Sequence, residues 1–103
     1  MKGEIQMAVE NRIVNDILTY IGNQKKSDWY VGIATNAKER LFSNHNVAEK
    51  GSAGWIFRTA LSEQNARDTE KYLLDFYGFK GGIGGGLCPK CVYAYRITSY
   101  TKE

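Results

Sequence analysis

The stretch WYVGIATNAKERL, residues 29–41, decides the predicted fold. Its first part, residues 29–34, is dense in aromatic and β-branched residues, a composition that favours a strand. Asn36 and Glu39 follow at the spacing of a helix capping box. The sequence therefore predicts a strand and then, without a long loop, a short helix that covers residues 37–44.

Hydrophobic periodicity and turn residues predict the remaining secondary structure. Apolar residues recur in steps of three and four from Ile5 to Ile21, which indicates an amphipathic helix that ends at Gly22. The other predictions are a loop at residues 46–54, a strand at residues 55–61, a helix at residues 63–77 between the caps Ser62 and Gly78, a glycine-rich loop at residues 81–86, and a strand at residues 92–97. The predicted fold class is α+β, with a small three-stranded antiparallel sheet covered by about three helices.

The composition is that of one small globular domain spanning residues 1–103. The apolar fraction of 43% and the charged fraction of 24% argue against disorder. The net charge of +3 permits contact with phosphates but falls short of the strongly basic balance of a dedicated nucleic-acid binder. The N-terminus carries mixed charge and no apolar run is long enough to span a membrane, so we expect a cytoplasmic protein with no membrane partner.

Glu70 is the most informative single residue. It lies four residues after Ala66 and three before Leu73, so the helical period places it on the inward face of its helix. A carboxylate there must be paired, bound to a metal or protonated, because an unpaired buried charge is very costly. The alternative is that Glu70 lies at the rim of the apolar stripe and forms an ion pair with an arginine.

Arg40 and His45 lie on and just beyond the short helix that follows the first strand. An arginine at this place can bind a phosphate bidentately, which a lysine cannot. His45 is the only histidine in the chain and lies about one turn further on, where it could shuttle a proton or bind a phosphate. The alternatives are a surface role for Arg40 and a helix-end cap for His45.

Tyrosines and glycines supply further candidates. Tyr30, Tyr93 and Tyr95 fall on predicted strands, where a tyrosine can orient a water or hold a phosphate oxygen, although such residues are more often part of the core. The glycine-rich loop could turn backbone N–H groups toward an anion, and its candidate binding residues are Lys80, Gly82, Gly84 and Gly85. The alternative is a flexible connection to the last strand.

Cys88 and Cys91 form one CxxC motif, which is half of a zinc site. His45 could add at most a third ligand, and no fourth is evident in the sequence. We therefore expect free thiols and no zinc, although a site shared between two copies of the chain stays open.

Together these residues resemble the GIY-YIG nuclease superfamily. Tyr30-Val31-Gly32 is similar to the second element of its motif, Arg40 follows Gly32 at the expected spacing of eight residues, and Glu70 stands on the later helix. The resemblance implies a phosphodiesterase that requires Mg²⁺ or Mn²⁺ and cuts nucleic acid. It further implies that tyrosines orient or deprotonate the attacking water, that Arg40 stabilises the phosphate and that Glu70 holds the metal.

Two departures from the family pattern set further expectations. No clean first motif precedes Tyr30, so we expect the strand at residues 92–97 to pair beside residues 29–34, as in a circular permutation, with Tyr93 or Tyr95 replacing the first-motif tyrosine. The family's histidine or tyrosine usually lies four residues after the arginine, where this chain has Asn44, and His45 is one residue further on.

The sequence leaves two functions open. The first is a metal-dependent endonuclease acting on DNA or RNA. The second is a catalytically inactive protein that binds a nucleotide or another phosphate ligand on the same scaffold, which the mild charge favours. The N-terminal helix could cover the sheet or pair with a second copy in a homodimer.

Overall fold

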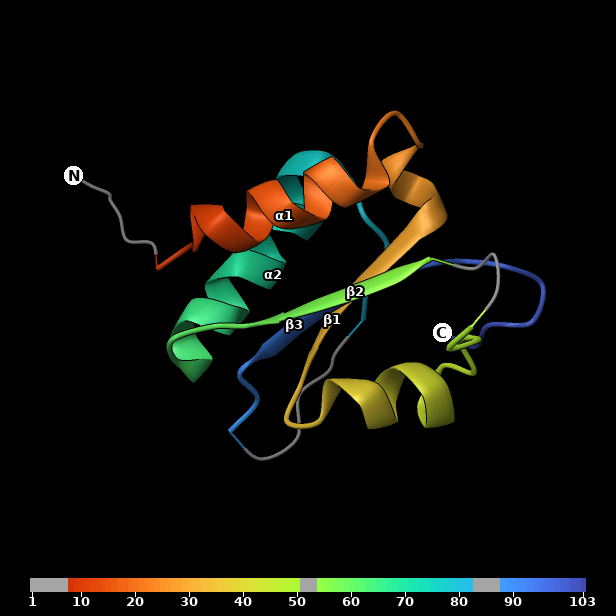
Figure 1. The fold of residues 1–103 in the computed structure, drawn as a ribbon. Coiled ribbons are helices and arrows are strands. Elements are labelled where there is room, and N and C mark those ends of the chain that lie inside the picture. The colour runs from red at the N-terminus through yellow and green to blue at the C-terminus, as the bar shows by residue number, and fades with distance from the viewer. Residues whose placement is uncertain (1–7, 51–53, 83–87) are drawn as a thin grey trace.

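The structure, a computed structural model, describes residues 8–50, 54–82 and 88–103. The predictions that concern Ile5, Gly84 and Gly85 lie outside these residues. Within them the chain folds as a small α+β domain with one three-stranded antiparallel sheet, as predicted (Figure 1).

The last strand of the chain lies in the middle of the sheet. The strands are β1 (Trp29–Ala34), β2 (Trp55–Thr59) and β3 (Cys91–Arg96), and their order is β1-β3-β2. Both pairings of β3 are antiparallel, and in the pair with β1 Gly32 lies opposite Tyr93. The expected pairing of the last strand beside residues 29–34 is therefore confirmed.

Helices cover both faces of the sheet. The helices α1 (Asn11–Ile21) and α2 (Glu63–Tyr77) pack on one face, whereas the π-helix η2 (Glu39–Asn44) lies on the other (Figure 1). A short 3₁₀ helix, η1 (Lys26–Asp28), leads into β1. The apolar side of α1 is buried against the sheet through Ile13, Ile17 and Ile21, so α1 covers the sheet of its own chain.

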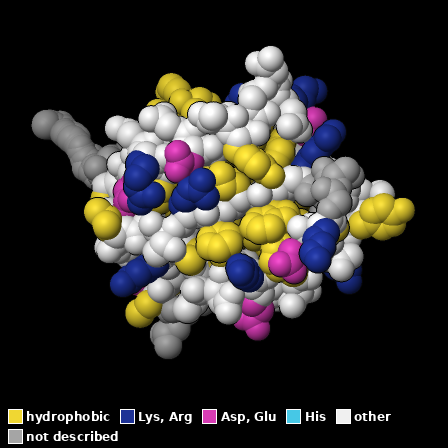
Figure 2. Space-filling model, viewed as in Figure 1, with side chains coloured by type: hydrophobic (Ala, Val, Ile, Leu, Met, Phe, Trp, Pro, Cys, Tyr) yellow, Lys and Arg dark blue, Asp and Glu magenta, His cyan; other side chains and the backbone are white. Residues whose placement is uncertain are grey.

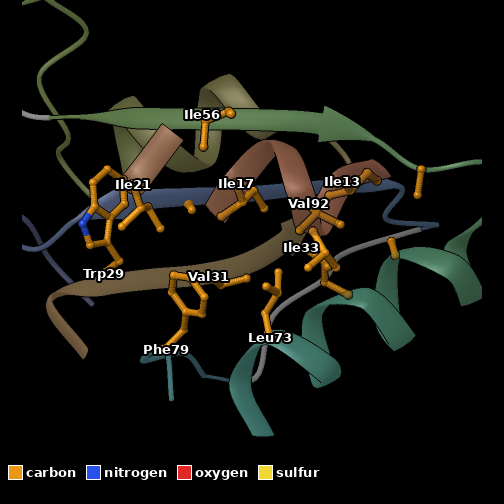
Figure 3. Close-up of a cluster of buried hydrophobic side chains, with 14 residues drawn as sticks. Ile13, Ile17, Ile21, Trp29, Val31, Ile33, Ile56, Leu73, Phe79 and Val92 are labelled. Carbon is orange, nitrogen blue, oxygen red and sulfur yellow. The ribbon is translucent and has the colours of Figure 1, made fainter. Parts of the chain in front are cut away.

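The face below α1 and α2 is a hydrocarbon core. Val31 and Ile33 of β1 and Val92 of β3 meet isoleucines of α1 and Leu73 of α2 (Figure 3). Because successive side chains of a strand point to opposite faces, the alternate residues of β1 and β3 must lie on the other side of the sheet. Tyr30, Tyr93 and Tyr95 are among them, and they form a second buried cluster beneath η2.

Most predicted boundaries are close to the observed ones. Helix α2 has its predicted bounds, and Ser62 Oγ accepts a hydrogen bond from the Asn65 N–H at 3.0 Å. Asn36 Oδ1 likewise accepts one from the Glu39 N–H at 3.1 Å, and the short helix begins at Ala37 as predicted. Its last six residues are wound as a π-helix, in which the His45 N–H donates to the Arg40 carbonyl.

Four predicted boundaries are wrong, and hydrogen bonds account for three of them. The first helix does not include Val9, because the amides of Ala8 and Glu10 donate to Asp68 and Thr69 of α2. Strand β2 ends at Thr59, and the exposed Leu61 donates its N–H to Glu10 Oε2 at 2.7 Å. The last strand, β3, begins at Cys91, one residue before the predicted start, and ends at Arg96, because the Ile97 N–H donates to the Asp28 carbonyl instead.

The surface carries no large area of one charge on the face shown in Figure 2. Basic and acidic side chains are interspersed there around a central group of hydrophobic side chains. No helix among the described residues has the length and apolar character to cross a membrane.

Candidate active site

Three tyrosines and the only histidine meet on the sheet face beneath η2. We call Tyr30, His45, Tyr93 and Tyr95 the tyrosine–histidine cluster. The Tyr30 ring centre lies 5.1 Å from that of Tyr95, 6.4 Å from that of Tyr93 and 4.8 Å from that of His45. The strands β1 and β3 supply the tyrosines, because their paired register places these side chains next to one another.

His45 is the C-cap residue of η2, and its side chain is a buried member of a hydrogen-bond chain. Its side chain is 4% exposed, its Nε2 lies 2.7 Å from Tyr93 Oη, and its Nδ1 lies 2.6 Å from the Lys102 carbonyl oxygen. A carbonyl oxygen can only accept, so Nδ1 carries the proton. Burial lowers the pKa of His45, which favours the neutral ring. Nε2 is then an acceptor, and the Tyr93 hydroxyl donates to it.

Gly32 makes room for Tyr93. A Cβ at residue 32 would lie 2.5 Å from Tyr93 Oη and 2.6 Å from its Cζ, distances that real Cβ atoms do not show. The glycine of the Tyr30-Val31-Gly32 element therefore lets the phenol ring of β3 lie directly on β1. Burial raises the pKa of Tyr93 above its ordinary value, so this hydroxyl keeps its proton at neutral pH.

Arg40 provides a positive charge beside the cluster. It is partly buried on η2, and its charge lowers the pKa values of Tyr30, His45 and Tyr93, although burial is the larger influence on each. Among the described residues its guanidinium has neither a hydrogen bond nor an ion pair. Arg40 is thus near the tyrosines with its donors available to a ligand.

Glu70 lies on α2, within electrostatic range of two of the tyrosines. Its negative charge raises the pKa values of Tyr30 and Tyr93, which places it within electrostatic reach of both. Burial raises the pKa of Glu70 itself to about 7. Its Oε2 is buried and has no hydrogen-bond partner within the described part of the chain. Glu70 as a whole is half-buried, so it lies at the border of the apolar face of α2 with one carboxylate oxygen buried.

The partly buried position of the Glu70 carboxylate is not explained by an ion pair among the described residues. The nearest charge that affects its pKa is Arg67, which lies one turn away and forms its own ion pair with Glu63 at 2.8 Å. No arginine in the described ranges pairs with Glu70. A carboxylate left in this state is a candidate ligand, because a buried oxygen without a partner is costly unless something binds it.

The donor set fits one hard cation and does not form a complete protein site. Within residues 8–50, 54–82 and 88–103, no three side chains of His, Cys, Asp or Glu are grouped for a metal. Mg²⁺ is commonly held by one or two carboxylates while phosphate oxygens and waters complete its shell. Glu70 fits that arrangement. Cys88 and Cys91 are free thiols, and both ring nitrogens of His45 are already hydrogen-bonded.

The start of the glycine-rich loop lies against Tyr30 at the edge of the sheet. The Val31 N–H donates to the Lys80 carbonyl at 2.8 Å, and the Lys80 N–H donates to the Trp29 carbonyl at 2.9 Å. A hydrogen bond from the Gly82 backbone lowers the pKa of Tyr30, partly offsetting the effect of its burial. Gly82 and the backbone of Lys80 therefore lie beside Tyr30, whereas Gly84 and Gly85 are not among the described residues.

Most of the predicted site residues come together here, but one functional group was missed. The Lys102 backbone carbonyl, which binds His45, has no side-chain pattern that could identify it in the sequence. Comparisons of the chain with protein family models, curated proteins and solved structures give no match.

Proposed function

We propose that this protein is a metal-dependent phosphodiesterase of the GIY-YIG type that hydrolyses nucleic acid. The observation that carries the proposal is the buried Oε2 of Glu70, which lacks a hydrogen-bond partner among the described residues. The charge of Glu70 also acts on Tyr93, whose hydroxyl is hydrogen-bonded to His45. A carboxylate whose pKa burial raises, within electrostatic range of two buried tyrosines, is more typical of a catalytic site than of a packed core.

The roles are those that the resemblance to the GIY-YIG superfamily implies. Arg40 would bind the scissile phosphate, and Glu70 would hold Mg²⁺ or Mn²⁺. When bound, such an ion stabilises negative charge on phosphoryl oxygens. Tyr30 contributes a hydroxyl beside Gly82 that can orient the attacking water.

Tyr93 is the proposed proton acceptor, with His45 behind it. Since the Tyr93 hydroxyl donates to His45 Nε2, its lone pairs are left to accept from a water. As that water attacks phosphorus, its proton passes to Tyr93 Oη while the Tyr93 proton passes to His45 Nε2. The raised pKa of Tyr93 opposes a free tyrosinate, so this transfer in one concerted step is the less costly route.

Tyr93, and not Tyr95, is the better replacement for the first-motif tyrosine. Tyr93 lies on Gly32, and the charges of both Arg40 and Glu70 affect its pKa. Tyr95 instead donates to the Lys102 carbonyl at 3.2 Å. The pairing of β3 beside β1 supports the permuted arrangement.

Binding without hydrolysis is the second candidate. A pKa of about 7 allows Glu70 to be protonated near neutral pH, and a protonated Glu70 would tolerate an anion without a metal. Arg40, Tyr30 and Gly82 would then hold the phosphate of a nucleotide. The net charge of +3 suits such a small ligand.

A cleavage assay separates the two candidates. Labelled single- and double-stranded DNA and RNA would be incubated with the protein and Mg²⁺ or Mn²⁺. Glu70→Gln should abolish cleavage, whereas Glu63→Gln, on the same helix, should not. Cleavage that survives Glu70→Gln would contradict the proposed site. If no substrate is cut but a nucleotide raises the melting temperature, the protein is a binder.

A further inference from the structure

The chain after β3 returns across the site and is bonded to His45. We call residues 98–102 the strap. The Lys102 N–H donates to the His45 carbonyl at 2.7 Å, and His45 Nδ1 donates to the Lys102 carbonyl at 2.6 Å. Asn46 Nδ2 donates to the Tyr100 carbonyl at 2.9 Å. Every one of these contacts involves a backbone atom of the strap.

The strap is a turn closed by its own hydrogen bonds. The Thr98 N–H donates to Thr101 Oγ1 at 3.0 Å, and Thr101 Oγ1 donates to the Thr98 carbonyl at 3.1 Å. Just before it, the Ile97 N–H donates to the Asp28 carbonyl, which fixes where the strap leaves the sheet. By contrast, the side chain of Tyr100 is 79% exposed, so the strap is held by its backbone and threonines and not by a buried anchor.

The Lys102 carbonyl accepts two hydrogen bonds at once, one from a ring nitrogen and one from a hydroxyl. It accepts from His45 Nδ1 and from the Tyr95 hydroxyl, which lies 3.2 Å away. If this acceptor were absent, the neutral ring could carry its proton on Nε2 instead. Nε2 would then donate to Tyr93 Oη, and the Tyr93 proton would turn away from His45 toward the site.

We propose that the strap is a positioning element: the Lys102 carbonyl holds His45 in the Nδ1–H tautomer and so keeps the Tyr93 hydroxyl turned toward His45, with its lone pairs toward the site. The tautomer follows from the contacts alone. The consequence for catalysis rests on the proposed function.

The surroundings of His45 favour a neutral imidazole ring, whose tautomer the strap can then fix. The rings of Tyr30, Tyr93 and Tyr95 pack around it. Burial lowers the pKa of His45 and the charge of Arg40 adds to this, whereas the Lys102 carbonyl and Glu103 act in the opposite sense. Within residues 8–50, 54–82 and 88–103, the strap thus contributes the backbone acceptor that distinguishes the two ring nitrogens.

Nitrogen-15 NMR on the full chain tests this directly, because His45 is the only histidine. Long-range proton–nitrogen correlations show which ring nitrogen carries the proton. Wild type and Lys102→Ala, which keeps the backbone carbonyl and N–H, should both show protonated Nδ1 and bare Nε2. Lys102→Pro removes the N–H that binds His45 and displaces the strap, so it should show a mixture of tautomers. Thr101→Val, which breaks the turn, should change the spectrum in the same direction.

The outcomes separate the strap from the proposed function. A wild-type ring protonated at Nε2 would overturn the strap proposal, and so would two strap variants that leave the tautomer unchanged. If Lys102→Pro fails to fold, Thr101→Val and the wild-type spectrum still decide. If the tautomers behave as expected but the wild type cuts no nucleic acid, the strap stands and the proposed function fails. If it does cut, Lys102→Pro should lower kcat at least about tenfold with little change in KM.

Discussion

The two faces of the sheet are made by alternate residues of the same strands, yet they differ in what they bury. The face below α1 and α2 buries hydrocarbon, for example Val31, Ile33 and Val92. The face below η2 buries phenol and imidazole groups, and hydrogen bonds join His45 to Tyr93, Tyr95 and the strap. The first face is stable when its side chains pack closely. On the second face each buried polar atom must also form a hydrogen bond. Stability should therefore depend mainly on the first face and chemistry on the second.

Truncating a large side chain on the face below α1 and α2 should have the largest effect on stability. Ile17 is fully buried in α1, so Ile17→Ala should lower the free energy of unfolding by about 2–5 kcal/mol. Urea denaturation measures this loss. Leu61→Ala is the control, because Leu61 is 81% exposed and its truncation should change stability by less than about 0.5 kcal/mol. The His45 tautomer should be the same in both. A loss as small in Ile17→Ala as in the control would refute the proposed division.

A methyl group at residue 32 should disrupt the face below η2, where Tyr93 lies against Gly32. Gly32→Ala places a Cβ against Tyr93, so we expect a loss of about 1–3 kcal/mol and a displaced hydroxyl. Gly78→Ala is the matched control, because its Cβ would meet no atom within 4 Å and only the strain of φ 79° remains. Thermal unfolding and the His45 nitrogen spectrum would be recorded for both. An unchanged His45 spectrum in Gly32→Ala would show that Tyr93 does not need this space.

Neutralising Glu70 should give a smaller effect that depends on pH. Burial raises the pKa of Glu70 from 4.5 to about 7, so the folded state prefers the protonated carboxyl. Below pH 4.5 folded and unfolded chains both bind this proton, and Glu70→Gln should change little. As the pH rises through 7, the wild type loses stability that the variant keeps. After allowing for partial exposure, the gain at pH 8 should be roughly 1–2 kcal/mol. Melting temperatures from pH 4 to pH 8 would show it, and a difference that does not vary with pH would contradict a buried carboxylate.

The sequence predicts the face below α1 and α2 better than the face below η2, which carries the tyrosine–histidine cluster. Spacing of apolar residues identified α1 and α2, and Ser62 and Gly78 marked both ends of α2, because these signals lie within one segment. The side chain of Glu70 could also be placed, since helical period alone turns it inward. The pairing of β3 with β1 was reached through the family resemblance, because strands that are distant in the chain leave no local signal of their pairing.

The strap and the π-helix could not be predicted, for a physical reason. The Lys102 carbonyl is a backbone group that every residue has, so no residue type reveals that it binds His45. The π turn that places His45 five residues after its hydrogen-bond partner Arg40 likewise depends on tertiary packing. Asn44, and not His45, lies four residues after Arg40, where the GIY-YIG superfamily that the sequence resembles usually has a histidine or tyrosine.

Binding of Mn²⁺ tests the central claim most directly. The protein would be labelled with nitrogen-15 and titrated with Mn²⁺ at pH 8 in the presence of a deoxynucleoside monophosphate, whose phosphate can complete the metal shell. We expect paramagnetic broadening to centre on Glu70 and to extend to Tyr30 and Tyr93. Glu70→Gln should remove this broadening, whereas Glu63→Gln should not. Broadening that is centred elsewhere, or that persists in Glu70→Gln, would contradict a metal site at Glu70.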